Sequence, residues 1–231
     1  ATKNLLKASV EAGVGAFLFA SSAAIYGDPK YLPVDEKHPL APMSPYGEAK
    51  GHADVLVRKF GAELATSALR LFNVYGPGQS DNSPYSGVIA LFRKKTLAGE
   101  NVIIYGEGSA TRDFIHIDDV LTSLEIASQQ SNIDGEIIDV GTGNETSVEE
   151  IVNLSNQLSD DDMIINWNDK KQPKIDISDE SIFLGRQKMQ KLNWKPFISL
   201  EVGLRKTVEW YKKLLSDQIL AKQYLLNNRI L

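Results

Sequence analysis

Tyr46 and Lys50 stand four residues apart in the stretch "SPYGEAK", residues 44–50. On a helix, positions i and i+4 lie one turn apart on the same side, so these two side chains would project together. A free phenol has a pKa of about 10 and is a poor base at neutral pH, but an adjacent ammonium stabilises its phenolate. The pair therefore suits a general base, although the same spacing also occurs in ordinary surface pairs.

The residues around this pair predict a helix that begins at Ser44. Ser44 suits the N-cap, and Pro45 suits the first helical position because its missing N–H would have no partner there. Apolar residues then recur on one side of the predicted helix, at Ala49, Ala53, Leu56, Val57 and Phe60. Tyr46 and Lys50 would therefore lie in its first turns.

Upstream of this helix, "AFLFA" (16–20) is apolar at every position. Such a run is typical of a parallel strand that is buried on both faces. A helix without an N-terminal cap is predicted over 2–12, closed by Gly13 and Gly15, and "SSAAIYGDP" (21–29) is predicted as a loop.

Strands and helices continue to alternate along the chain. The stretch "TSALRLFNVYGPG" (66–78) predicts a strand that ends in a Gly/Pro loop. Further strands are predicted at 101–105, 113–117 and 136–140, with helices near 87–98 and 118–129. "SVEE" (147–150) predicts a capping box, and 200–231 is predicted as helical. The alternation predicts an α/β fold with a mainly parallel sheet.

Ligands of open α/β sheets bind at the carboxyl ends of the strands. In this sequence Ser21 and Ser22 follow one predicted strand, and Phe72 and Asn73 follow the core of the next. These loops are therefore where we expect chemistry. Two glycine clusters, "GEGSAT" (106–111) and "GTGNET" (141–146), lack the third glycine of a dinucleotide-binding turn, and we interpret both as turns.

Composition excludes several classes of function. The net charge is −5 with scattered Lys and Arg, which argues against a nucleic-acid partner. No apolar run approaches the roughly 18 residues that span a bilayer. The sequence has no cysteine, and its three histidines lack metal-ligand spacing, so we expect no metal site. We expect a soluble, cytoplasmic protein.

Six motifs together resemble a known family. "FLFASSAAIYGDP", "SPYGEAK", "RLFNVYGPG", "VIIYGEGSATRDFIHIDDV", "DVGTGNETSVEEI" and "LNWKP" occur in an order and at spacings that resemble the extended short-chain dehydrogenase/reductase family. The resemblance covers nearly the whole chain and is strongest to nucleotide-sugar epimerases of the UDP-glucose 4-epimerase type. It implies NAD as cofactor, a UDP-sugar substrate and a homodimer.

The resemblance also implies roles for individual residues. Tyr46 matches the family's catalytic base, and Lys50 matches the lysine that holds the nicotinamide ribose and lowers the tyrosine pKa. Ser22 matches the hydroxyl that contacts the sugar oxygen being oxidised. Ala20, Ser21 and Phe72 are implied on the cofactor side.

Four further residues are implied in substrate binding. Asn73 and Arg112 match contacts to the diphosphate, for which a planar guanidinium is well suited. Tyr105 and Val88 match positions beside the nucleotide base. Each residue also has a structural alternative: Ser22 could only cap a helix, Phe72 and Tyr105 could be core aromatics, and Arg112 could pair with a neighbouring aspartate.

The implied fold is the C-terminal part of a Rossmann-type sheet with a smaller, mostly helical substrate-binding portion. We assign 1–80 and 107–142 to the NAD-binding part, and 81–106 and 143–231 to the substrate-binding portion. The family's Gly-rich turn, its ribose-binding acid and its first three strands have no counterpart in this sequence. We therefore expect this chain alone to bind NAD weakly. We expect the sequence to be either a fragment of a longer protein or a shortened family member that another chain completes.

The positions after Ser22 distinguish the reactions of this family. Sugar 4,6-dehydratases carry an acidic pair there, because elimination of water needs a general acid and a base. This sequence has Ala23 and Ala24 instead, which favours C4 epimerisation of a UDP-glucose/UDP-galactose type substrate. The alternatives are another NAD-dependent epimerase, reductase or dehydratase of the family, and a non-catalytic binding module. The family usually carries a second phosphate-binding arginine around "NDKKQPKIDISD" (168–179), where this sequence has Lys170 and Lys171 instead.

Overall fold

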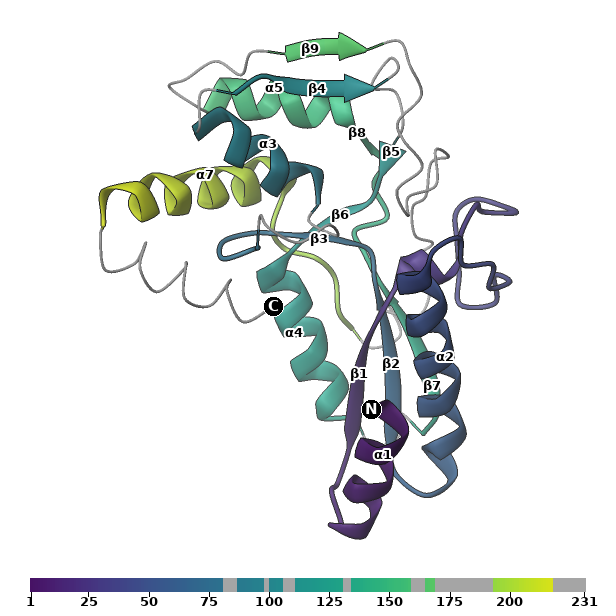
Figure 1. Ribbon diagram of the computed structural model, residues 1–231. Coiled ribbons are helices and arrows are strands. Elements are labelled where there is room, and N and C mark those ends of the chain that lie inside the picture. Colours follow the sequence, from purple (N-terminus) through teal and green to yellow (C-terminus); the bar gives the residue numbers. More distant parts are fainter. Residues whose placement is uncertain are drawn as a thin grey trace.

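The computed structural model describes residues 1–80, 87–97, 100–105, 111–130, 134–158, 165–168 and 193–217. Its central feature is a parallel sheet in the order β1-β2-β7, formed by Phe17–Ser22, Thr66–Leu71 and Glu136–Val140 (Figure 1). The three predicted strands and their parallel arrangement are confirmed. In the described part of the chain β1 pairs with β2 alone, so its other edge is open.

Helices cover both faces of this sheet. Because successive strand residues point to opposite faces, Ala68 and Leu69 of β2 belong to different cores. Ala68 packs with Leu6 of α1 (Thr2–Glu11) and Val57 of α2 (Pro45–Lys59). Leu69 packs instead in a core that contains Val120 of α4 (Ile117–Ser128). The predicted α/β class is thereby confirmed.

A second group of elements lies above this sheet in Figure 1. The strands β3 (Asn73–Tyr75) and β6 (Phe114–His116) pair in parallel between the two groups. Above them are α3 (Val88–Leu97), β4 (Val102–Tyr105), α5 (Val148–Leu158), β9 (Ile165–Asn168) and α7 (Leu200–Ser216), with β4 parallel to β9. A short antiparallel pair, β5 (Thr111–Arg112) and β8 (Thr146–Ser147), was not predicted.

This upper group shares one hydrophobic core, which also includes residues of β3 and β6. Its buried members are Tyr75, Ile89, Phe92, Val102, Ile104, Phe114, Ile151, Val152 and Leu204. The core therefore draws on both segments that we assigned to a substrate-binding portion. The assignment of these segments as a separate domain stays a prediction.

Local hydrogen bonds explain where the helices begin. The Ser44 hydroxyl accepts from the Gly47 amide at 2.9 Å and caps α2, as predicted. The capping box before α5 is also confirmed, because the Glu150 carboxylate accepts from the Ser147 amide at 2.7 Å and the Ser147 hydroxyl accepts from the Glu150 amide at 3.0 Å. The predicted C-terminal helix is confirmed from Leu200 to Ser216. It ends there because Asp217 is extended, so the predicted continuation is wrong at this residue, and residues 218–231 lie outside the described part.

The segment 21–29 is not the simple loop that we predicted. Ser21 and Ser22 extend β1, because pairing with β2 continues to Ser22 opposite Leu71. Residues Ala23–Ile25 then form a short 3₁₀ helix, η1, since the Ser22 hydroxyl accepts from the Ala24 amide. Ser22 thus stands at the junction between strand and helix.

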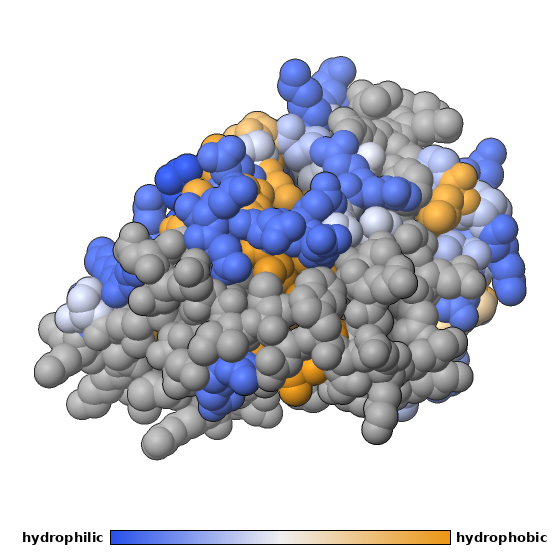
Figure 2. Space-filling model, turned by 90° about the horizontal axis from the view of Figure 1, so that it is seen from above, coloured by the Kyte–Doolittle hydropathy of each residue, from blue (hydrophilic) through white to orange (hydrophobic). Residues whose placement is uncertain are grey.

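The surface seen from the top of Figure 1 is shown in Figure 2. Hydrophilic side chains cover much of its described part, and apolar side chains show between them. None of the described helices is both long and apolar enough to cross a membrane.

Candidate active site

The carboxyl end of β1 and the first two turns of α2 carry Ser22, Tyr46 and Lys50 in one part of the molecule. The helix begins beside η1, at the top of the central sheet in Figure 1. A Cβ atom added to Gly47 would lie only 2.8 Å from the backbone oxygen of Ala24. Because Gly47 has no side chain, the turn that carries Tyr46 can approach the segment that follows Ser22.

Lys50 links α2 to β1. Its Nζ donates to the backbone oxygen of Ala20 at 2.7 Å, and it lies 5.7 Å from the ring centroid of Tyr46. The ring of Phe19 lies 5.1 Å from the same nitrogen. Lys50 is half-buried, and this burial lowers its pKa. The ammonium therefore lies at the end of the strand and close to the tyrosine ring.

Among the described residues, the Ser22 hydroxyl makes a capping contact and keeps its own proton for a further contact. Its hydroxyl accepts from the Ala24 amide at 3.2 Å, which is the structural alternative that the sequence left open. That contact uses an acceptor position of the hydroxyl, and a hydroxyl also carries one proton that it can donate. Because Ser22 is half-buried, a ligand can still reach this proton.

Ser21 and Phe72 have side chains that face the interior. Ser21 is 3% exposed, and its hydroxyl donates to Asp54 Oδ2 at 2.9 Å. Phe72 is 5% exposed and packs with Ala23 and Ile25. A cofactor contact by Ser21 would therefore use its backbone, and the Phe72 ring serves mainly as core.

The predicted substrate-binding residues lie on other elements. Asn73 begins β3, and its Nδ2 donates to the Asp113 backbone oxygen at 3.3 Å. Arg112 lies in β5, where Nη1 donates to the Thr111 backbone oxygen at 2.7 Å. Val88 begins α3 and Tyr105 ends β4, both in the upper group. The structure thus places Tyr46 and Lys50 beside the end of β1 that carries Ser22. The four predicted substrate-binding residues lie on β3, β5, α3 and β4.

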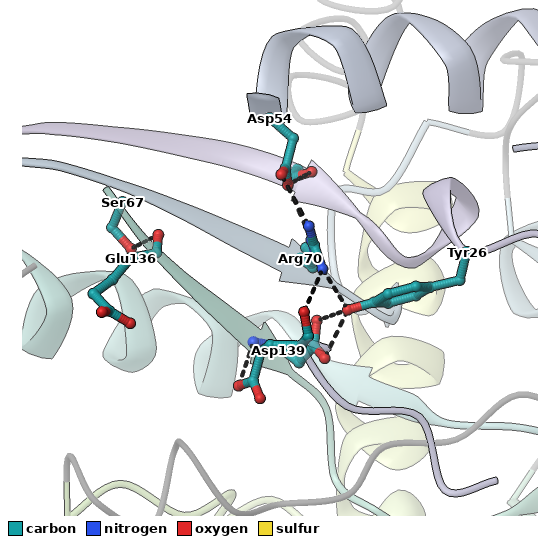
Figure 3. Close-up of polar contacts among 8 residues, drawn as sticks. Tyr26, Asp54, Ser67, Arg70, Glu136 and Asp139 are labelled. Carbon is teal, nitrogen blue, oxygen red and sulfur yellow. Dashed lines mark hydrogen bonds and ion pairs between the residues drawn. The ribbon is translucent and has the colours of Figure 1, made fainter. Parts of the chain in front are cut away.

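Beneath the candidate site lies a buried charged network that sequence reasoning missed (Figure 3). Arg70 is 1% exposed; its Nε and Nη2 donate to the two oxygens of Asp54, each at 3.0 Å. Its Nη1 donates to the Tyr26 hydroxyl at 2.9 Å, and that hydroxyl donates to Asp139 at 2.6 Å. The network joins α2, β2, β7 and the segment after η1.

Burial dominates the electrostatics of this network. The pKa of Asp139 is raised to about 7, mainly by burial. The charges of Glu36 and Asp35 also act to raise this pKa, whereas the hydrogen bond from Tyr26 and the charge of Arg70 act to lower it. Burial and the charge of Asp139 raise the pKa of Tyr26. One signal in the sequence pointed to this network: Arg70 interrupts the apolar pattern of "TSALRL", and a buried guanidinium needs partners.

The loop 141–143 is held by a buried carboxylate. Asp113 is fully buried and accepts from the Thr142 amide at 2.7 Å, the Thr142 hydroxyl at 2.6 Å and the Gly143 amide at 2.7 Å. Amides that cradle a phosphate must point to the ligand. Here they point to Asp113, which gives a physical reason to interpret this glycine cluster as a turn. The cluster at 106–110 lies outside the described residues.

Comparison with known proteins assigns the chain to a family. Residues 1–141 match the sequence pattern of the NAD dependent epimerase/dehydratase family. The chain belongs to this family. The predicted resemblance to this family is thereby confirmed.

Members of the epimerase/dehydratase family match along most of the chain. UDP-glucose 4-epimerase of Mycolicibacterium smegmatis is 31% identical over 215 residues, which cover 91% of this chain and 67% of that protein. The structure of UDP-glucose 4-epimerase with UDP-glucose from Thermotoga maritima has a TM-score of 0.81 and 35% identity, with 93% of this chain and 69% of that chain covered. The dTDP-D-glucose 4,6-dehydratase of Mus musculus is 29% identical over 218 residues, which cover 92% of this chain and 60% of that protein.

The chain thus spans about two thirds of the length of the two epimerases. The likeness to the Thermotoga structure confirms the predicted Rossmann-like fold. In the described residues no group of His, Cys, Asp or Glu is arranged to hold a metal ion.

Proposed function

We propose that this chain carries the catalytic residues of an NAD-dependent nucleotide-sugar 4-epimerase, with a UDP-glucose/UDP-galactose type substrate. The observation that carries the proposal is the junction of β1 and α2, where Lys50 Nζ lies 2.7 Å from the Ala20 oxygen and 5.7 Å from the Tyr46 ring, next to Ser22. A phenol, an ammonium and a serine hydroxyl at one strand end suit the removal of a proton from a sugar hydroxyl.

The residues at this junction fit the nicotinamide half of NAD. An ammonium has three donors, and in the described part of the chain Ala20 takes one, so Lys50 retains donors for ribose hydroxyls. The other half of the dinucleotide needs a helix N-terminus or a loop with amides directed at phosphate. The loop 141–143 cannot supply them, because its amides are directed at Asp113. Within the described residues, we therefore propose the nicotinamide ribose as the part of NAD that this junction contacts.

Each member of the triad has one task in the proposed reaction. Tyr46 removes the proton from the sugar's C4 hydroxyl, and Lys50 favours the phenolate by its positive charge. Ser22 donates its hydroxyl proton to the same sugar oxygen, where negative charge develops. When bound, NAD would supply the acceptor and donor of the C4 hydride. Tyr46 then gives its proton back to that oxygen.

The surroundings of Ser22 favour epimerisation over dehydration. Dehydration is the reaction in the name of the mouse relative, dTDP-D-glucose 4,6-dehydratase. Dehydration needs an added acid and base beside the catalytic hydroxyl. Ala23 is 8% exposed, and the backbone oxygen of Ala24 is in close approach to Gly47. These positions therefore offer only methyl groups.

Substrate binding is proposed for the residues that extend from this junction. Asn73 and Arg112 would contact the diphosphate, while Val88 and Tyr105 would contact the nucleotide base. Asn73 lies on β3, which pairs with β6 between the central sheet and the upper group, and Arg112 lies on β5. Val88 packs against the upper core. A UDP-sugar would then extend from the β1 end toward α3 and β4.

A homodimer is proposed through α1 and α2. Leu5 is 59% exposed on α1 and Val55 is 37% exposed on α2, and the two helices pack on the same face of the sheet. A second copy could cover both. Light scattering of the purified protein is expected to give the mass of a dimer, and a monodisperse monomer would contradict this proposal.

A second candidate is a non-catalytic nucleotide-sugar binding module. It is favoured by the open edge of β1 and by the engagement of the 141–143 amides with Asp113. Such a module would bind the sugar nucleotide without converting it.

One experiment separates the two candidates. The purified chain is denatured and released NAD is measured by absorbance and mass, and conversion of UDP-galactose to UDP-glucose is followed in parallel with NAD added. The epimerase proposal predicts conversion without net formation of NADH. Binding of UDP-galactose without conversion, at saturating NAD, would contradict it and support the binding module.

A further inference from the structure

Asp54 lies on the face of α2 that carries the proposed catalytic residues. It follows Lys50 by one helical turn and Tyr46 by about two, so the three residues form one row along the helix. The Asp54 side chain is fully buried, in contrast to the half-buried Tyr46 and Lys50. The row therefore runs from the candidate site into the interior.

The carboxylate of Asp54 joins this helix to β1. Its Oδ2 accepts from the Ser21 hydroxyl at 2.9 Å, and Ser21 immediately precedes Ser22. One turn earlier, Lys50 Nζ donates to Ala20, the residue before Ser21. Two successive members of the helical row thus contact two successive residues of the strand. Together they fix how far α2 lies along β1, and hence where Tyr46 stands relative to Ser22.

Arg70 fixes the direction of this carboxylate. Its guanidinium binds both Asp54 oxygens, and its remaining nitrogen is held by Tyr26, which in turn binds Asp139 (Figure 3). A bidentate pair of this kind restrains both distance and angle. A buried ion pair is weak evidence for stability, because well-packed apolar residues of similar volume often stabilise a protein as much. Its directional restraint is what apolar residues cannot supply.

We propose that Asp54 is a positioning residue, which holds Tyr46 and Lys50 in register with Ser22 through Ser21 and Arg70. This inference rests on the proposed epimerase function and deepens it. Asp54 touches neither sugar nor cofactor; it acts on the reaction only through the placement of α2 against the end of β1.

The test replaces the charged pair by apolar residues of similar size, in the double variant Asp54→Leu/Arg70→Met. This change leaves no unpaired charge between the two positions, so the variant is expected to fold. We expect kcat for the UDP-sugar to fall about 100-fold with KM within about threefold, because a misplacement of about 1 Å at reacting groups costs that much. A purely structural pair predicts a changed melting temperature and an unchanged kcat.

A matched control uses another tie between the same helix and β2. The Thr66 hydroxyl donates to the Val57 backbone oxygen at 2.8 Å, about three turns from Tyr46. Thr66→Val removes this buried hydrogen bond with little change in shape. We expect it to lower the melting temperature while kcat stays within about twofold of wild type. A fall in kcat as large as that of the double variant would overturn the proposal.

Hydrogen exchange supplies a readout that does not depend on turnover. In the double variant, peptides that cover 17–25 and 45–51 are expected to lose protection at equal global stability. If wild type epimerises the sugar and the double variant keeps both its kcat and this protection, the positioning role is overturned while the proposed function stands. If wild type does not convert the sugar, the proposed function fails and the catalytic role of Asp54 fails with it.

A milder variant covers the case in which the double variant does not fold. Ser21→Ala removes only the hydroxyl that joins Asp54 to β1 and leaves the Arg70 pair intact. We expect a fall in kcat of about threefold to tenfold, with KM unchanged. An unchanged kcat in this folded variant would overturn the role of the Ser21 contact.

Discussion

The close approach of α2 to η1 predicts opposite effects for two glycines on the same helix. An added Cβ at Gly47 would lie 2.8 Å from the Ala24 oxygen and 3.0 Å from Pro42 Cβ, whereas one at Gly51 would meet only Ile25, at 3.8 Å. Gly51→Ala should stabilise the protein by about 1 kcal/mol, because alanine is the better helix former. Gly47→Ala should destabilise it by about 1 to 3 kcal/mol, since backbone must move to make room.

The assay is urea unfolding of both variants, followed by circular dichroism. The expected free energies of unfolding differ by about 2 to 4 kcal/mol between the two alanine variants, from the sum of the two effects. Gly51→Ala serves as the matched control, because it makes the same substitution one turn later on the same helix. Equal stabilities of the two variants would refute the contact between α2 and η1 on which the placement of Tyr46 depends.

Three other perturbations test the buried polar groups. Burial raises the pKa of Asp139 from 3.8 in the unfolded chain to about 7 in the folded protein. The protonated carboxyl therefore contributes its full stabilisation of the folded protein below about pH 4, and this contribution is lost as the pH rises to 7. Asp139→Asn should therefore become more stable relative to wild type by several kcal/mol between pH 5 and pH 8 in urea unfolding, and parallel pH profiles would contradict this. Ser44→Ala removes the cap on the Gly47 amide and should cost about 1 kcal/mol by the same assay, whereas a cost near zero would argue against the cap. Asp113→Ala removes the acceptor of the 141–143 amides and should cost about 3 kcal/mol and increase hydrogen exchange of Thr142, and unchanged protection there would contradict the contact.

Local patterns in the sequence predicted the elements that support the site. Ser44 and Pro45 marked the start of α2, and the apolar run "AFLFA" marked β1, because caps and buried parallel strands have strong local signals. The end of β1 was predicted too early. Ser21 and Ser22 are polar, yet they remain in the strand because β2 pairs with them and because Ser21 finds a buried acceptor in Asp54.

The buried network required long-range information. Arg70 and Asp139 lie 69 residues apart in the chain, and only the parallel pairing of β2 with β7 places them opposite each other. The inward direction of the Ser21 side chain depends in the same way on Asp54, which is 33 residues away. Periodicity predicts which face of an element is buried, but it does not predict which distant partner satisfies a buried charge.

The most direct test of the account is the reduction of bound NAD in the protein that carries these residues. On addition of a UDP-sugar under single-turnover conditions, absorbance at the NADH band should rise transiently in wild type. In Tyr46→Phe the band should stay flat while equilibrium dialysis still shows nucleotide-sugar binding, because only the proton acceptor is lost. NADH formation in Tyr46→Phe at a rate comparable to wild type would contradict the proposed role of Tyr46 as the proton acceptor.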